Sequence, residues 1–349
     1  MIQQAFDLPE MIETDEQLDE IVSRPAPELV RSLAGLSGDI IMLGIGGKLG
    51  PDLARLALRA ANQAGIVKKI YGVSRFSTPG VRKKLSQTGV ETIQSDLLEP
   101  DALRKLPDVE NVIFLIGRKF GTGGAECFTW AWNTYLPGLV AERFRDSKIV
   151  VLSSGNVYPF VPVTSGGADE SVPPDPIGEY GQSVLGRERL FEYFSRKFNT
   201  PAVFVRLNYS NSLRYGILPD IAQKVLNGKP IDLTTGNVNI VWQGDTNTYI
   251  LRSFEITDSP PVCLNLTGPE AVSVRWLAQE LGKRIGKEPV FKNEPSDTAL
   301  LSNAAFCFEK FGYPKVPLKK MVDWAAHWIT HGGSLLNKPT HFEERKGKF

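Results

Sequence analysis

The sequence contains few of the residue types that build metal sites and redox-active thiol pairs. Its 349 residues include three cysteines and three histidines. The cysteines, Cys127, Cys263 and Cys307, are odd in number and lack the close spacing of zinc ligands or of a redox pair. This usage fits a protein of the reducing cytoplasm with no metal centre built on cysteine.

The sequence also lacks an excess of charge of either sign and a long apolar run. Its 40 Lys and Arg residues nearly balance 39 Asp and Glu residues, for a net charge of +1. This balance gives no reason to expect a nucleic acid or an anionic membrane as a partner. No apolar run reaches membrane length, and acids between Asp7 and Glu20 replace the apolar core of a signal peptide. We therefore expect a cytoplasmic protein that binds neither.

Three potential metal ligands recur near the C-terminus. Asp323, His327 and His331 follow one another at intervals of four residues on and just past a helical pattern at 321–330. A metal site needs three or four convergent ligands, and a histidine also suits the negative end of a helix. We interpret the pattern as an ordinary terminal helix and expect no bound metal.

A glycine-rich turn follows the first strongly apolar segment. Residues 39–43 form an apolar run of strand length, residues 44–50 have the sequence GIGGKLG, and a helical pattern starts at Pro51. Such glycines permit a tight turn and close approach of the backbone to a pyrophosphate, toward which a helix N-terminus directs unpaired N–H groups. The context of strand, turn and helix therefore predicts a dinucleotide site. Its expected residues are Gly44, Gly47, Lys48, Leu49 and Gly50.

The second predicted strand, at 69–74, ends without an acidic residue. An acid at this point would bind the ribose 2′-hydroxyl of NAD, whereas Arg75, which follows Ser74, would suit a 2′-phosphate. With Lys48 in the glycine turn, Arg75 predicts NADP as the cofactor, and NAD stays the alternative because both cations are also ordinary surface residues. Asp96 and Leu97, just past the third strand, are placed to meet the adenine.

Further strand-like segments alternate with helical spacers. They lie at 90–93, 111–116, 148–153 and 202–206. This alternation predicts an α/β fold with a doubly wound parallel sheet, and the continuous apolar character of the last three fits strands buried on both faces. Gly117, after the fourth strand, is also placed at the cofactor site.

Four segments in the order of one family strengthen this prediction. They are residues 132–135 (WNTY), 152–159 (LSSGNVYP), 179–188 (EYGQSVLGRE) and 263–274 (CLNLTGPEAVSV). Over roughly residues 38 to 330, the chain resembles an extended short-chain dehydrogenase/reductase of the NAD-dependent epimerase/dehydratase family. The resemblance implies that Ser154 and Tyr180 contact the reacting oxygen, and it matches Asn133, a further candidate catalytic residue, to a helix asparagine of the family.

The domain organisation follows from the same resemblance and from helix signals before the glycine turn. We expect the Rossmann domain at 39–210, with 236–267 returning to it, and a smaller substrate lobe at 211–235 and 268–349. A capping box at Thr14 and the proline at 27 predict two short helices in a 1–38 extension. The extension covers a sheet edge, mediates contacts in a homo-oligomer or is a surface appendage.

One position departs from the family's pattern. The residue one helical turn after Tyr180 is Val184, where the family carries a lysine that stabilises the tyrosine's phenolate. A phenol titrates near ~10 without a nearby cation, so Tyr180 alone is a poor base at neutral pH. Lys119 after the fourth strand, or Arg187 two turns beyond Tyr180, could supply the charge, and either could instead be structural.

The substrate-binding residues are less defined. Asn208 or Asn211 resembles the asparagine with which the family meets a substrate phosphate, but residues 239–245 lack the family's arginine. Because that arginine clamps phosphate, its absence favours a free sugar-like molecule over a nucleotide diphosphate. We predict an NADP-dependent oxidoreductase or epimerase for a sugar-like hydroxyl or ketone. The alternatives are a catalytically silent dinucleotide sensor and a sugar dehydratase or lyase that uses the cofactor transiently.

Overall fold

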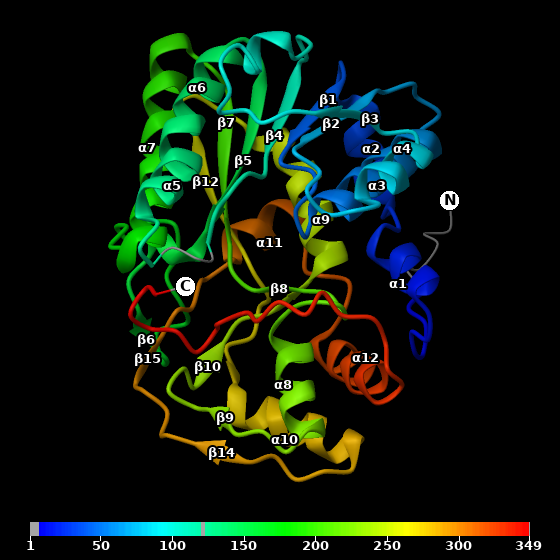
Figure 1. The fold of residues 1–349 in the computed structure, drawn as a ribbon, viewed down its shortest axis with the longest axis vertical. Helices are drawn as coiled ribbons and strands as arrows, with labels where there is room; N and C mark the ends of the chain where they lie inside the picture. The colour runs from blue at the N-terminus through cyan, green and yellow to red at the C-terminus, as the bar shows by residue number, and fades with distance from the viewer. Residues whose placement is uncertain (1–6, 120–122, 349) are drawn as a thin grey trace.

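A seven-stranded parallel sheet forms the centre of the larger lobe in a computed structural model that describes residues 7–119 and 123–348 (Figure 1). Its strands stand in the order β12-β7-β5-β4-β1-β2-β3. Their bounds are β1 Ile40–Leu43, β2 Ile70–Ser74, β3 Glu91–Gln94, β4 Asn111–Phe114, β5 Lys148–Ser154, β7 Ala202–Leu207 and β12 Val262–Leu266. The order reverses between β1 and β4, which creates the crevice where such sheets bind ligands. The predicted doubly wound sheet is confirmed.

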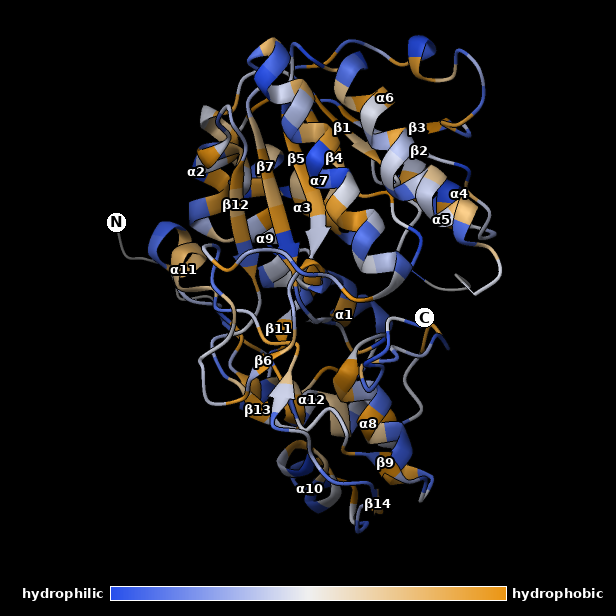
Figure 2. Cartoon of the chain, turned by 90° about the vertical axis from the view of Figure 1, so that its left-hand side faces the viewer, coloured by the Kyte–Doolittle hydropathy of each residue, from blue (hydrophilic) through white to orange (hydrophobic). Residues whose placement is uncertain are grey.

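Helices cover both faces of this sheet because alternate residues of each strand point to opposite sides. In β1, Ile40 and Met42 enter a core shared with α3 and α9, whereas Ile41 and Leu43 enter a core shared with α6 and α7. The helices of this lobe are α3 Gly50–Gln63, α4 Val81–Gln87, α5 Glu126–Trp130, α6 Leu136–Arg143, α7 Gly178–Phe198, α9 Gln243–Arg252 and α11 Ala305–Phe311. Figure 2 shows the strands between them as largely hydrophobic, as predicted for strands buried on both faces.

A smaller lobe lies beyond the carboxyl ends of the strands (Figure 1). It is built on α8 Ile217–Leu226, α10 Val274–Ile285 and α12 Leu318–Thr330. The rings of Trp242 and Trp324 meet edge to face in its core at 5.2 Å. The short strands are β6 Val161–Pro162, β8 Ser210–Asn211, β9 Ile231–Asp232, β10 Asn237–Val238, β11 Val241–Trp242, β13 Val272–Ser273, β14 Phe291–Lys292 and β15 Thr298–Ala299. No helix in the part of the chain described here has the length and apolar character to span a membrane.

The N-terminal extension contributes to the hydrophobic cores of both lobes. It forms the two predicted helices, α1 Asp15–Val22 and α2 Pro27–Gly35, and the Thr14 hydroxyl caps α1 by accepting a bond from the Gln17 N–H at 3.2 Å. Apolar residues of α1 pack into the core of the smaller lobe, whereas Leu29 and Leu33 of α2 pack beneath the sheet. The extension is therefore a structural link and not a surface appendage.

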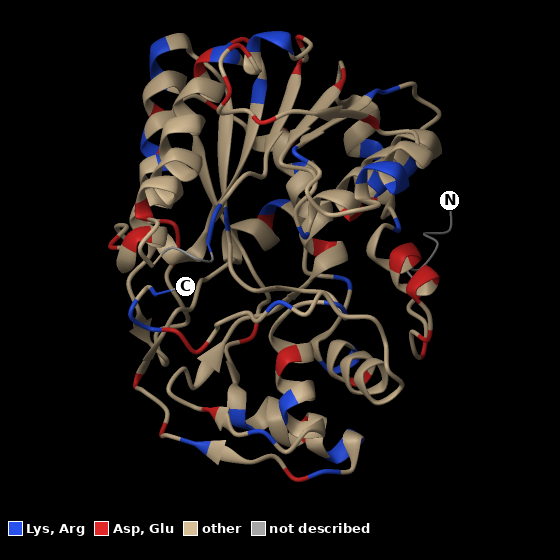
Figure 3. Cartoon of the chain, in the orientation of Figure 1, with Lys and Arg blue, Asp and Glu red and all other residues tan. Residues whose placement is uncertain are grey.

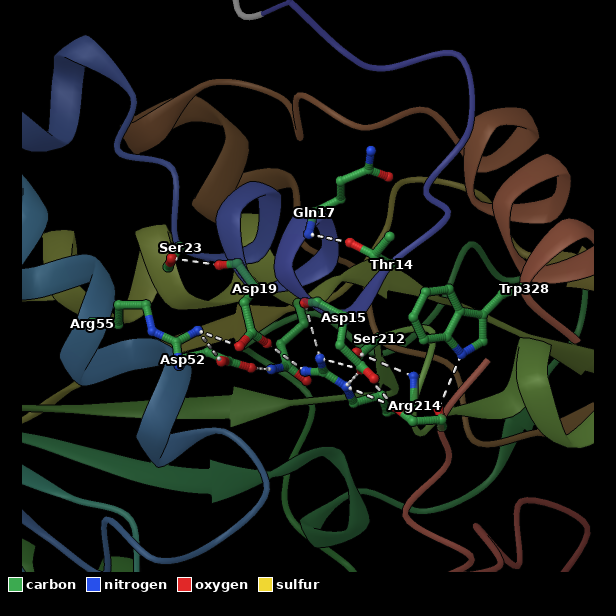
Figure 4. A network of polar contacts seen from close by, with 12 residues as sticks. Thr14, Asp15, Gln17, Asp19, Ser23, Asp52, Arg55, Ser212, Arg214 and Trp328 are labelled. Atoms are coloured by element: carbon green, nitrogen blue, oxygen red, sulfur yellow. Dashed lines mark hydrogen bonds and ion pairs between the residues drawn. The ribbon is translucent and has the colours of Figure 1, made fainter. Parts of the chain in front are cut away.

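A polar network fixes α1 between the two lobes (Figure 4). Arg214, which follows β8, donates to Asp15 at 2.7 Å and to Asp19 at 2.6 Å. Asp19 also pairs at 3.2 Å with Arg55 of α3, and Arg55 contacts Asp52 in the first turn of that helix at 3.4 Å. These contacts join the helix after the glycine turn to the smaller lobe through α1.

Asp52 makes this network sensitive to pH. Burial raises the pKa of Asp52 from 3.8 to about 6, although Arg55 opposes the shift. The ionised carboxylate is therefore less favourable in the folded chain than in the unfolded one. Its contribution to stability is present in full below about pH 4 and is lost as pH rises through about 6.

We expect Asp52→Asn to raise the free energy of unfolding at about pH 7.5 by about 1–3 kcal/mol, with a much smaller gain at about pH 4. The asparagine oxygen can still accept the 2.7 Å bond from the Gln243 amide. Urea unfolding at the two pH values measures the difference. Asp146→Asn, at an exposed carboxylate, is the control and should change stability little. A loss of stability in Asp52→Asn at about pH 7.5 would contradict the raised pKa.

Candidate functional site

The glycine turn has the backbone geometry that close approach of a phosphate requires. It connects β1 to α3, and Gly44 has a φ of +93°, a conformation that favours glycine. A Cβ at Gly44 would lie 2.7 Å from the Ile116 side chain, and one at Gly50 would collide with the Ile45 carbonyl. Pro51 stands in the first turn of α3 as expected. The turn thus presents bare backbone at a helix N-terminus, and its assignment to the cofactor stays a prediction.

Lys48 of this turn faces the smaller lobe. Its Nζ lies 3.5 Å from the centre of the Tyr215 ring. Burial, together with the nearby charges of Lys338 and Lys119, lowers the pKa of Lys48 to about 7. Positive charge from three separate segments therefore gathers at the mouth of the glycine turn.

Arg75 faces a different set of groups. Its guanidinium lies 3.8 Å from the Asp96 carboxylate and 4.7 Å from the centre of the Trp132 ring. Ser74, the last residue of β2, accepts a hydrogen bond from the Phe76 N–H at 3.2 Å. The two cations predicted to meet one 2′-phosphate thus make different contacts, and Arg75 is the one beside the end of β2.

Lys119 lies beside Tyr180. Its Nζ is 5.7 Å from the centre of the Tyr180 ring, and burial lowers the pKa of Lys119 to about 8. Tyr180 stands in the first turn of α7 and is partly buried. Lys119 is therefore within cation–π range of the Tyr180 ring, and Arg187, the other candidate to replace the family's lysine, also interacts electrostatically with Tyr180.

Ser154 ends β5 with its hydroxyl held by a neighbouring asparagine. The Ser154 Oγ accepts bonds from the Asn156 backbone N–H at 3.2 Å and from its side-chain amide at 3.0 Å. Because both bonds use the oxygen as an acceptor, the hydroxyl proton remains available to a third group.

Val184 lies in surroundings that do not suit the lysine that the family carries at this position. Its side chain is fully buried in a cluster with Val157, Tyr158 and Ala168, against which Tyr180 packs. An ammonium group at this position would enter an apolar environment and lose its hydration. The helix face after Tyr180 is thus built for packing.

Arg187 is buried beneath the loop that follows β4. Its guanidinium donates to the Leu152 carbonyl at 2.6 Å and to the Asn133 side-chain oxygen at 3.2 Å. Burial lowers the pKa of Arg187 to about 10. A Cβ at Gly117 would lie 3.2 Å from this guanidinium, so the loop passes directly over it.

Asn133 connects the same loop to α7. It lies in a π-helical turn, Ala131–Tyr135, between α5 and α6. Its side chain accepts a bond from the Arg118 N–H at 2.8 Å and donates to the Arg118 carbonyl and the Ser183 hydroxyl, each at 3.0 Å. These bonds position the segment that carries Lys119, and the catalytic assignment of Asn133 stays a prediction.

The two candidate substrate asparagines both bind backbone groups. The Asn208 amide donates to the Leu300 carbonyl at 3.1 Å. Asn211 donates to the Tyr209 carbonyl at 2.8 Å and accepts from the Leu218 N–H at 3.1 Å, in the first turn of α8. Both side chains are buried, so their visible role is to shape the connection between the lobes. Contact with substrate remains a prediction for each.

A buried ion pair behind the site was not foreseen. Arg206 of β7 bonds both oxygens of Glu188 on α7, at 3.0 and 2.7 Å. The Ser153 hydroxyl donates to the same carboxylate at 2.5 Å, and Arg206 also donates to the Tyr158 hydroxyl at 2.8 Å. The available signal was the charge of Arg206 in an otherwise apolar strand.

The C-terminal segment also enters the site unforeseen. Residues 333–348, which we name the C-terminal strap, cross between the two lobes (Figure 1). The strap lines a pocket of about 380 Å³, a volume that includes open solvent. The other walls include Lys119, Asn156, Tyr158 and Tyr209. Two of these wall residues connect the pocket to the candidate catalytic residues. Lys119 lies beside Tyr180, and Asn156 donates a hydrogen bond to Ser154.

The terminal helix makes no metal-like arrangement. Asp323 pairs with Arg284 at 2.5 Å, and the rings of His327 and His331 stack at 4.0 Å. Within residues 7–119 and 123–348, no three His, Cys, Asp or Glu side chains are grouped as a metal site would need.

We expect Arg206→Met to lower the free energy of unfolding by about 3–5 kcal/mol, because it leaves the Glu188 carboxylate buried without its cation. The double variant Glu188→Gln with Arg206→Met should recover part of this loss. Urea unfolding measures both, with Arg189→Met at an exposed position as the control. A loss below about 1 kcal/mol for Arg206→Met would match an exposed pair and refute the structural role.

Comparison with known proteins identifies a family and a fold. Residues 40–243 match the model of the NAD dependent epimerase/dehydratase family. No curated protein matches the sequence. Among solved structures, UDP-glucuronic acid 4-epimerase from Bacillus cereus, in complex with UDP-glucuronic acid and NAD, is similar with a TM-score of 0.70 at 19% identity. The similarity covers 83% of this chain and 98% of that one.

Two further structures share the fold. UDP-glucose 4-epimerase from Thermotoga maritima, with UDP-glucose, has a TM-score of 0.69 at 18% identity over 83% of this chain and 98% of its own. The UDP-glucose 4-epimerase of Thermus thermophilus, in complex with NAD, has a TM-score of 0.69 at 17% identity over 85% of this chain and 100% of its own. At these identities the likeness is one of fold.

Proposed function

The chain belongs to the NAD dependent epimerase/dehydratase family, and from this we propose that it is a dinucleotide-dependent oxidoreductase or epimerase acting on a sugar-like hydroxyl or ketone. The observation that carries the proposal is the position of Lys119, whose Nζ lies 5.7 Å from the Tyr180 ring centre. A cation near a phenol favours its ionised form. Lys119 thus supports proton exchange by Tyr180 despite the valine at 184.

The residues of the glycine turn fit a dinucleotide. Gly44 and Gly50 keep the turn tight, because a Cβ at either would strike Ile116 or Ile45, and the helix N-terminus that follows suits a pyrophosphate, with Lys48 as a cation in the same turn. When bound, the dinucleotide supplies the hydride acceptor or donor. The protein's own residues orient it and exclude groups that would compete for the site.

Tyr180 and Ser154 perform the proton chemistry in this proposal. Tyr180 takes a proton from the substrate hydroxyl, or returns one to the ketone, as a general base or acid. Ser154 donates a hydrogen bond, without transferring its proton, to the same substrate oxygen, because its own oxygen already accepts two bonds from Asn156. Asn133 and Arg187 hold the surrounding loop and helix in place.

A second candidate function is a catalytically silent dinucleotide sensor. The observation that favours it is the burial of Val184, which leaves the helix without its usual cation. A sensor requires the binding surface and no proton transfer. The two functions therefore predict different results for a variant without the Tyr180 hydroxyl. An enzyme would lose turnover, whereas a sensor would behave as the wild type does.

We propose NADP as the preferred cofactor because Arg75 stands at the end of β2 where an acid would favour NAD. Arg75 is 58% exposed and its pair with Asp96 spans 3.8 Å, so the pair is weak and a 2′-phosphate can replace the carboxylate. One charge-assisted contact favours NADP by about tenfold to hundredfold.

The cofactor prediction is tested by calorimetry of NADP and NAD binding. Arg75→Ala should erase most of the preference by weakening NADP binding while leaving NAD binding nearly unchanged. Arg104→Ala, an exposed arginine of the same lobe, is the matched control and should bind both as the wild type does. Equal affinities in the wild type, or a preference for NAD, would sink the assignment.

The enzyme prediction is tested with Tyr180→Phe and Lys119→Met. Tyr180→Phe should slow the substrate-dependent change in nicotinamide absorbance by about 10²–10⁴-fold while dinucleotide affinity stays the same. Lys119→Met should lower turnover and move the rising limb of the pH profile to higher pH, because the phenol loses its neighbouring cation.

Tyr135→Phe is the control for the loss of a hydroxyl, since Tyr135 is an exposed residue. Its turnover should equal that of the wild type. If the wild type binds dinucleotide but exchanges no hydride with any sugar, sugar acid or polyol, the sensor replaces the enzyme as the better conclusion.

A further inference from the structure

The C-terminal strap forms one wall of the pocket beside the proposed reaction site. It leaves α12, crosses between the lobes and approaches the start of α7 (Figure 1). There the backbone of Gly347 lies so close to Gly178 that a Cβ on Gly178 would be 2.6 Å from the Gly347 carbonyl oxygen. Tyr180 stands two residues further along the same helix.

Several contacts fix the strap in this position. Phe342 is buried in the core of the smaller lobe. Thr340 donates to the Asp220 carboxylate from its N–H at 2.9 Å and from its hydroxyl at 2.5 Å, and Glu343 pairs with Lys224 at 2.7 Å. The strap is thus held by both packing and charge on α8, and its later residues have a defined place. Figure 3 shows basic and acidic residues along it.

Arg345 is the strap's cation at the pocket. Its Nη atoms donate to the Thr298 carbonyl and hydroxyl, each at 2.7 Å, and its guanidinium lies 4.1 Å from the centre of the Phe160 ring. A guanidinium has more N–H groups than these two bonds use. Within the described ranges 7–119 and 123–348, no carboxylate forms an ion pair with Arg345. The neighbouring Glu344 also lines the pocket, but one of its oxygens accepts the Lys346 N–H at 2.5 Å.

The pocket has a charge suited to a small anion. Two cations, Lys119 and Arg345, line it together with one carboxylate, that of Glu344, so the cations are in excess. The amides of Asn208 and Asn211 are already bonded to backbone, and no arginine stands in residues 239–245 to clamp a diphosphate.

We propose that this pocket binds the carboxylate of a sugar acid through Arg345, with a hydroxyl of the same molecule directed to Tyr180. Arg345 brings to the pocket a guanidinium, which binds carboxylates through charge-assisted hydrogen bonds, and Asn156 and Tyr209 also line the pocket. The proposal rests on the proposed function for the reacting end of the substrate. Recognition of the carboxylate itself requires no turnover.

The test compares each acid with its neutral partner, using glucuronate against glucose and galacturonate against galactose. Calorimetry with saturating oxidised dinucleotide measures binding, and nicotinamide absorbance measures turnover. We expect at least one acid to bind about tenfold to hundredfold more tightly than its neutral partner. Arg345→Met should abolish this preference, and Arg345→Lys should restore part of it.

Two further variants keep the test decisive. Arg345→Gln removes the charge but retains amide donors for Thr298, so it should lose the preference without loss of folding. Lys346→Met, at the exposed neighbouring residue, should keep the preference. Equal binding of acid and neutral partner in both pairs, or a preference that survives both Arg345→Met and Arg345→Gln, would overturn the proposal. An Arg345-dependent preference without hydride exchange would support this site while the proposed function fails.

Discussion

The buried pair of Glu188 and Arg206 is the interaction on which the arrangement of the site depends. It connects α7, which carries Tyr180, to β7, and the Ser153 hydroxyl extends the connection to the strand that ends in Ser154. Two charges removed from water are tolerated only when each finds its full set of partners. The geometry of one helix relative to two strands is therefore fixed by a group that itself touches no expected ligand.

Ion pairs and apolar packing together hold the two lobes in place. On one side, α1 contributes apolar residues to the smaller lobe and carboxylates to Arg214 and Arg55. Elsewhere, the C-terminal strap lies on α8 and approaches α7. The lobes are thus connected by segments that are remote in sequence, and the site between them has walls from both.

Much of the fold was predictable because it depends on local periodicity. The strand β1, the turn at Gly44 and the cap at Thr14 each follow from a few neighbouring residues, and each was expected at nearly the observed position. The approach of Lys119 to Tyr180 was one of two alternatives, since loop conformation decides it. Nothing in the pattern around Val184 could show that its surroundings come from Val157 and Ala168.

The parts of the site that were missed depend on long-range contacts. Arg206 and Glu188 are recognisable as partners only after β7 and α7 have packed. The strap has no regular secondary structure between its anchors, so it produces no periodic pattern that would place Arg345 beside Thr298. Asn208 and Asn211 had the residue type expected of ligand-binding groups, yet their amides serve the backbone.

The contact between Lys48 and Tyr215 implies that cofactor loading and the arrangement of the lobes are coupled equilibria. One ammonium group, 3.5 Å from the ring centre of a smaller-lobe tyrosine, also belongs to the glycine turn that we propose binds the cofactor's phosphates. An anion that draws this charge toward the turn weakens a bridge between the lobes. By thermodynamic reciprocity, any ligand that strengthens the bridge must weaken the hold on that anion to the same degree. The affinities of the two ligands are then coupled through the placement of a single positive charge.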